Sequence, residues 1–145
     1  MTDTTAVKRS VGYWIVAIFA LVWNLIGVAM WYLQISMTPE QLAMLPEAQR
    51  QVYEATPGWI NLAFAVAVFA GVLGGSGLLL KKRWAATMFL LSLVALLVQV
   101  IGAFVATPAW AAYGPVGLVM PVVLVAIALF LLWYANQAKA RGWLS

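Results

Sequence analysis

Apolar residues dominate four long stretches of the chain, and short polar segments separate them. The stretches cover about residues 11–35, 59–80, 84–106 and 116–134. An α-helix needs about 20 apolar residues to cross the roughly 30 Å hydrocarbon core of a bilayer, and each stretch has about that length. The pattern predicts an all-α membrane protein whose residues 1–145 form a single domain, an antiparallel bundle of four transmembrane helices.

Prolines mark several of the predicted helix ends. Pro57 precedes the second stretch and Pro108 follows the third, which are positions where a proline does not interrupt a helix. Pro121 falls inside the fourth stretch, where it removes a backbone N–H donor and crowds the carbonyl group of Gly117. We therefore expect a kink in the fourth helix at Pro121.

The segment at residues 37–56 is the longest polar connection. It opens with Thr38, Pro39, Glu40 and Gln41, a helix N-cap with proline in the first turn and a capping-box partner three residues after the cap. Pro46 is placed to start a second helix. The segment predicts short amphipathic helices that lie on the membrane surface or plug the mouth of the bundle.

The distribution of charge predicts the orientation of the helices. Basic residues fill the turn at residues 81–83 and lie near both termini, as Lys8, Arg9, Lys139 and Arg141. The connection at residues 37–56 instead carries three glutamates and one arginine. Since short cytoplasmic segments are enriched in Lys and Arg, we expect both termini and the turn at 81–83 in the cytoplasm of a multi-pass protein of the cell inner (plasma) membrane.

Composition excludes several kinds of function. Hydrophobic residues make up 66% and charged residues 8% of the chain, against roughly 25% charged residues in soluble domains. The chain has no Cys and no His, so thiol redox chemistry, Cys/His zinc sites, haem ligation by His and a histidine general base are absent. We expect no enzyme activity, cofactor or metal. The scattered basic residues form no face for nucleic acid.

Carboxylates offer the only route to an enzyme. Glu40, Glu47 and Glu54 recur every seven residues, a spacing that places them on nearly one face of a continuous helix. Pro46 interrupts that helix. We therefore interpret the three glutamates as a solvated acidic face, and rank a membrane enzyme last.

Small residues recur every fourth position along the second stretch. The series consists of Ala63, Ala67, Gly71 and Gly75, a small-xxx-small pattern that lets two helix backbones approach closely. Packing within the bundle is the first interpretation of this groove. A dimer interface or a sliding surface is the alternative.

Uncharged polar side chains lie on the predicted helix seams, and the four spans contain no charged residue. Charges inside a membrane usually mark proton relays and ion paths, so their absence favours a neutral solute or none. The seams predict a polar pocket reached from outside; the alternative is that the amides only join helices. The candidate ligand-binding residues are Trp23, Asn24, Trp31, Gln34, Asn61 and Gln99.

Three segments carry a resemblance to known proteins: WNLIGVAMWYLQ, MTPEQLAMLPEAQRQVYEATPGW and AFAVAVFAGVLGGSGLLLKKRWA. Together they resemble a family of small bacterial four-helix membrane proteins, often labelled sugar transporters and similar in general to DoxX-like proteins. The resemblance implies the four-helix architecture over most of the chain. The label implies a neutral sugar held by the amides of Asn24 and Gln99 against the indole of Trp23.

Two functions remain open from the sequence. The first is a passive carrier of a small neutral solute such as a sugar, which at this size should be at least a homodimer, since alternating access usually relates two repeats or protomers. The second is a non-transporting bundle that binds or assembles with another membrane protein or lipid. In both cases the lipid bilayer is the immediate partner.

Overall fold

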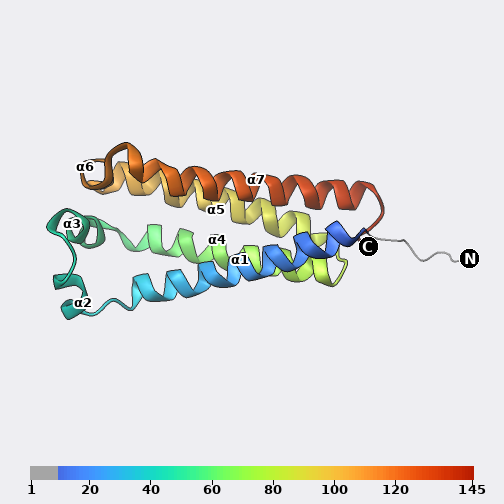
Figure 1. The fold of residues 1–145 in the computed structure, drawn as a ribbon, viewed down its shortest axis with the longest axis horizontal. Helices are drawn as coiled ribbons and strands as arrows, with labels where there is room; N and C mark the ends of the chain where they lie inside the picture. The colour runs from blue at the N-terminus through green and yellow to red at the C-terminus, as the bar shows by residue number, and fades with distance from the viewer. Residues whose placement is uncertain (1–9) are drawn as a thin grey trace, which may run out of the picture.

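The computed structural model describes residues 10–145, and within that range the chain is helical with no strand (Figure 1). Lys8 and Arg9, two of the residues used to predict orientation, lie outside the described range. The elements in chain order are α1 (Val11–Ile35), α2 (Pro39–Ala43), α3 (Glu47–Ala55), α4 (Gly58–Leu79), α5 (Trp84–Ala106), α6 (Ala109–Tyr113), the 3-10 helix η1 (Gly114–Leu118) and α7 (Val119–Ala140).

Four helical segments within residues 10–145 are long and apolar enough to cross a membrane. They are Val11–Ile35, Gly58–Leu79, Trp84–Ala106 and Ala109–Ala140, the last of which combines α6, η1 and α7. The chain therefore has the length and composition of a multi-pass membrane protein. The predicted bounds of the first and third helices agree with the structure, and those of the second differ by one residue at each end.

The fourth helix differs from the prediction. It begins at Val119 rather than residue 116, because residues 114–118 form a 3-10 helix, and it continues to Ala140 rather than residue 134. Pro121 consequently lies in the first turn of α7, where backbone N–H groups have no partner within the helix. At this position the proline removes no hydrogen bond from the interior of α7, so the predicted cause of a kink does not apply there, and the kink itself stays a prediction.

The connection between α1 and α4 contains both predicted short helices. Thr38 Oγ1 accepts a hydrogen bond from the backbone N–H of Gln41 at 3.2 Å, and Gln41 Oε1 accepts one from the backbone N–H of Thr38 at 3.0 Å. This reciprocal pair is the predicted capping box. The second helix, α3, follows Pro46 and packs against α6. Figure 1 shows α2, α3 and α6 together at one end of the bundle, here called the far end.

The long helices pack in sequence order. α4 and α5 contact each other along their length, while α1 packs on α4 and α7 packs on α5 (Figure 1). Glycines allow the closest approaches. A Cβ atom built on Gly75 would lie 2.8 Å from the Leu21 backbone nitrogen, and one built on Gly74 would lie 2.7 Å from the Phe89 ring. The helices could not come this close if either residue carried a side chain.

The opposite end of the bundle, here called the base, holds the main core. It consists of the start of α1, the turn between α4 and α5, the end of α7 and residues 141–145. Tyr13 is fully buried there, donates a hydrogen bond to the Leu78 carbonyl oxygen, and meets the Trp143 ring edge-on at 5.6 Å. Tyr13 thus joins α1 to α4 and to the segment that follows α7.

The segment after α7 also pairs with the turn between α4 and α5. The Ser145 amide donates to the Lys81 carbonyl oxygen at 2.9 Å, and the Arg83 amide donates to the Ser145 carbonyl oxygen at 3.1 Å. Leu144 is buried in the same core. Residues 143–145 therefore close the base of the bundle.

Candidate ligand-binding cavity

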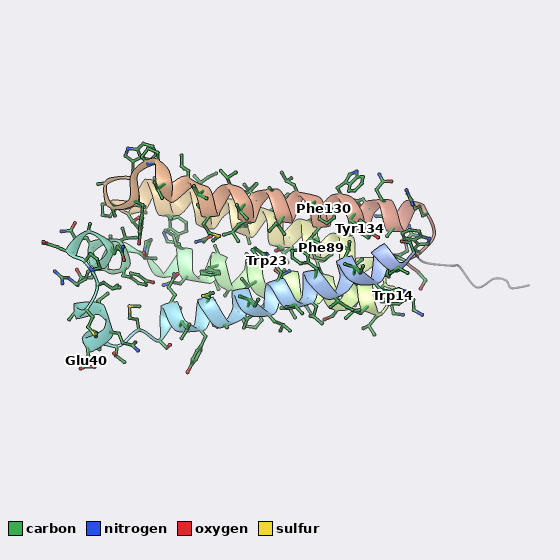
Figure 2. The ribbon with its side chains drawn as sticks, viewed as in Figure 1. Trp14, Trp23, Glu40, Phe89, Phe130 and Tyr134 are labelled. Atoms are coloured by element: carbon green, nitrogen blue, oxygen red, sulfur yellow. The ribbon has the colours of Figure 1, made fainter. Side chains whose placement is uncertain are left out.

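A cavity of about 410 Å³ lies between α1 and α7, with α4 and α5 forming its floor. Small-molecule sites in proteins usually measure about 300–1,000 Å³, so the space is large enough for a ligand. Figure 2 shows two of its lining residues, Trp23 and Phe89, away from both ends of the bundle. Its other lining residues include Asn24, Gly27, Met30, Ala67, Val68, Ser92, Leu96, Met120, Leu124, Ile127, Ala128 and Leu131.

The packing of the helices explains why a space remains. At the base α1 and α7 lie close together, with the rings of Tyr13 and Tyr134 separated by 6.4 Å between centroids. Farther along, each helix follows its own neighbour, α4 or α5, and the residues that face the space include the small Gly27, Ala67 and Ala128. These residues are too small to fill the distance between α1 and α7.

The cavity opens sideways, between the lipid-facing surfaces of α1 and α7. Two of its lining residues, Met30 on α1 and Met120 on α7, are 56% and 59% exposed. Both belong to segments that are long and apolar enough to lie in a bilayer. Methionine is unbranched and flexible, so it adapts to ligands of different shape. A hydrophobic molecule in the bilayer could therefore enter without crossing water.

Three of the lining residues have a polar side-chain atom: Trp23, Asn24 and Ser92. Asn24 Nδ2 donates to the Ala20 carbonyl oxygen at 2.7 Å, and Ser92 Oγ donates to the Ala67 carbonyl oxygen at 2.6 Å. All other lining residues are apolar. The sequence predicts a polar pocket, whereas the cavity between α1 and α7 is lined mainly by apolar residues.

Three of the predicted ligand-binding residues lie outside this cavity and join α1 to α4 instead. Gln34 Nε2 donates to Asn61 Oδ1 at 2.7 Å, and the Trp31 indole Nε1 donates to the Asn61 carbonyl oxygen at 3.1 Å. Their polar groups are already paired across two helices. This arrangement matches the alternative that seam amides hold the bundle together.

Gln99 is half-buried on α5, outside the cavity lining, and its side chain makes no hydrogen bond to any of residues 10–145. Trp59 also lies outside that lining and packs on Gly102, where a Cβ atom would lie 2.6 Å from the Trp59 ring. The six predicted residues thus separate into Trp23 and Asn24 at the cavity, the group at the α1–α4 contact, and Gln99 apart from both.

The small-residue groove of α4 serves packing within the bundle. A Cβ atom on Gly71 would overlap the Asn24 side chain, and Gly75 approaches the α1 backbone. Ala67 faces α5 and packs with Ala95, whereas Ala63 is only half-buried. Because α1 already covers Gly71 and Gly75, these glycines face no open surface on which a second copy could pack.

The described carboxylates lie at the far end, away from the cavity. Glu40 is on α2, where Figure 2 labels it at the end of the bundle, while Glu47 and Glu54 are on α3. All three side chains are exposed. Within residues 10–145, no group of three His, Cys, Asp or Glu side chains could hold a metal ion.

Comparison with known proteins found no match to the chain among protein-family models, curated proteins or solved structures. The resemblance to four-helix DoxX-like proteins therefore stays a prediction.

Proposed function

We propose that this chain is a membrane protein that binds a hydrophobic, lipid-like molecule in the cavity between α1 and α7. The observation that carries the proposal is an apolar space of about 410 Å³ that opens between lipid-facing residues. Moving apolar surface out of water lowers the free energy by about 25 cal/mol per Å². A molecule that enters the cavity from lipid gains less binding free energy in this way, because lipid is already apolar. Close packing against both helices therefore has to supply the affinity.

The same cavity is a poor site for a sugar. A sugar carries hydroxyl groups on all sides, and each polar group buried without a partner costs about 1–3 kcal/mol. Two of the three polar side chains at the cavity, Asn24 and Ser92, already use a donor within the protein. We therefore favour lipid binding over passive transport of a sugar or another small polar solute.

The charges support an antiparallel bundle whose base faces the cytoplasm of the inner membrane. The described basic residues at the base are Lys81, Lys82, Arg83, Lys139 and Arg141, and the described carboxylates all lie at the far end. Enrichment of Lys and Arg on the cytoplasmic side assigns both termini to the cytoplasm under this proposal, with the short helices of the far end outside.

Orientation can be measured directly because the chain has no cysteine. We expect a membrane-impermeant maleimide to label the Glu47→Cys variant in intact cells, and to label Ala140→Cys only after the membrane is permeabilised. Both positions are exposed, at the far end and at the base respectively. Labelling in the reverse order would overturn the proposed orientation.

Filling the cavity should abolish binding. We expect decane to raise the unfolding temperature of the detergent-solubilised wild type, since a ligand that binds only the folded state stabilises it by about 2.7 kcal/mol at a hundredfold excess over Kd. The Ala128→Phe variant, with a ring placed in the cavity, should lose this shift. Ala126, two residues away on α7, is exposed and outside the cavity lining, so Ala126→Phe is the matched control. Equal shifts in all three proteins would show that decane acts on the micelle, and would contradict the proposal.

A further inference from the structure

The cavity is closed toward the base. Two of its lining residues, Phe89 on α5 and Leu131 on α7, are each 2% exposed and belong to the main core at the base. The Phe89 ring packs directly on Gly74 of α4, where a side chain would have no room. A molecule in the cavity therefore cannot extend toward the base beyond Phe89 and Leu131.

The exposed lining residues lie nearer the far end. They are Ile26, Met30 and Met120, which are 50%, 56% and 59% exposed. Met30 follows Val11 by 19 residues and Met120 precedes Ala140 by 20, so at 1.5 Å per residue both lie about 28–30 Å from the base ends of their helices. Because the hydrocarbon core of a bilayer is roughly 30 Å thick, the open end of the cavity lies near the headgroups of the leaflet on the far-end side.

The distance between the two ends matches an acyl chain. On α7 the lining extends from Met120 at the open end to Leu131 at the closed end. These residues are eleven apart, which corresponds to about 16 Å of helix. An extended chain of single bonds advances about 1.2 Å per bond. About 14 carbon atoms therefore span the cavity from end to end.

The volume of the cavity leads to a similar number. An apolar cavity of about 150 Å³ accommodates benzene, with six carbon atoms, so about 410 Å³ corresponds to roughly 16 carbon atoms. This is enough for one acyl chain of ordinary length and too little for two. A lipid with two chains would leave its second chain in the bilayer.

Charge determines which end of the ligand enters. The cavity lining contains no ionisable side chain, and a charged group buried without a partner is strongly disfavoured. A charged or zwitterionic headgroup must therefore stay at the open end, level with the headgroups of the surrounding leaflet. The terminal methyl group then points toward the base.

We propose, on the basis of the function proposed above, that the cavity takes one acyl chain of a lipid from the leaflet on the far-end side. The chain lies along α7 with its methyl end against Phe89 and Leu131. The headgroup remains outside the cavity, so the cavity selects its ligand by chain length, with a limit near 14 carbon atoms.

A series of single-chain lipids tests the length limit. The protein is purified in digitonin, whose rigid ring system does not mimic an acyl chain, and lysophosphatidylcholines with saturated chains of 8 to 18 carbon atoms are added. We expect the rise in unfolding temperature to grow with chain length up to about 14 carbon atoms and then to level off or decrease. Ala128→Phe should lose this dependence and Ala126→Phe should keep it, which separates binding in the cavity from effects on the micelle.

A change at the closed end should move the limit. Leu131→Ala removes about three carbon atoms from the end of the cavity, so its limit should move to chains longer by about two or three carbon atoms. Leu129→Ala is the matched control, because Leu129 is 51% exposed and outside the lining, and it should keep the wild-type limit. A rise that continues to 18 carbon atoms in the wild type, or an unchanged limit in Leu131→Ala, would overturn the proposed position of the chain while leaving cavity binding intact.

A probe charged at both ends tests the direction of the chain. Dodecyltrimethylammonium should stabilise the wild type more than Ala128→Phe, whereas dodecane with a trimethylammonium group at each end should stabilise the two equally, since one charge would have to be buried at Phe89 and Leu131. Stronger stabilisation of the wild type by the doubly charged probe would overturn the methyl-inward orientation. If Ala128→Phe responded like the wild type to every lysophosphatidylcholine and to decane, the proposed function itself would be wrong.

Discussion

Replacing Gly75 with leucine should lower the free energy of unfolding by about 3 kcal/mol, the upper end of the usual range for overpacked cores. A Cβ atom at this position would lie 2.8 Å from the Leu21 backbone nitrogen and 2.9 Å from its Cα atom. A neighbouring side chain can rotate away, but these backbone atoms can move only with the whole of α1. The variant must therefore separate α1 from α4.

The measurement is the unfolding of purified protein in mixed detergent and sodium dodecyl sulfate, followed by circular dichroism. Gly58→Ala is the matched control, because a Cβ atom there meets nothing within 4 Å. That substitution should leave stability unchanged or slightly increased, since alanine forms helices better than glycine. A Gly75→Leu protein as stable as the control would mean that α1 does not pack on α4 as described.

The second large effect is expected at Tyr13. Its side chain is 0% exposed and packs at the base among residues of α4, α5 and α7. Truncation of a buried aromatic side chain usually costs about 3–5 kcal/mol, so Tyr13→Ala should destabilise the bundle by that amount in the same unfolding experiment. Ile15→Ala, two residues away at a position that is 62% exposed, should change stability by no more than about 0.5 kcal/mol.

Tyr13→Phe separates the two contributions of this residue. It keeps the ring but removes the hydroxyl group that donates to the Leu78 carbonyl oxygen. The Leu78 carbonyl oxygen still accepts the hydrogen bond from the Lys81 backbone N–H at 3.1 Å, so the expected loss is about 0.5–1.5 kcal/mol, the net contribution of one hydrogen bond. If Tyr13→Phe were as damaging as Tyr13→Ala, the ring packing would contribute little, and the account of the base core given above would be wrong.

Much of the helical framework could be predicted because its signals are local. The bounds of α1 and α5 follow from the lengths of the apolar runs, and the capping box of α2 follows from Thr38 and Gln41 three residues apart. The start of α7 could not be found in this way. Apolar residues continue through residues 116–118, and only the backbone conformation after Gly114, which has a φ of 64°, shows that a 3-10 helix precedes the α-helix.

The candidate site was harder to predict because it depends on pairs of helices. Small and polar residues on a seam predict close packing, and Gly71, Gly75 and the pair of Gln34 with Asn61 behave accordingly. The cavity arises where α1 and α7 follow different neighbours, and no pattern within either helix encodes that divergence. Ser92 and Ala128, both at the cavity, were missed for this reason. Trp23 could be proposed as a cavity residue from the sequence, because an indole near the middle of an apolar span needs a partner or an internal space.

The involvement of residues 143–145 in the base has a consequence for biosynthesis. Translation proceeds from the N-terminus, so Tyr13 and Leu78 enter the membrane long before Trp143 and Leu144 are made. Until then the Tyr13 ring lacks its contact with the Trp143 ring, and the turn at Lys81 lacks the hydrogen bonds from Ser145. Every nascent chain therefore passes through a stage in which the membrane helices are present but the base is open. A chain cut short before Trp143 would remain in that stage, with the core at Tyr13 left uncovered for the proteases that remove incomplete membrane proteins.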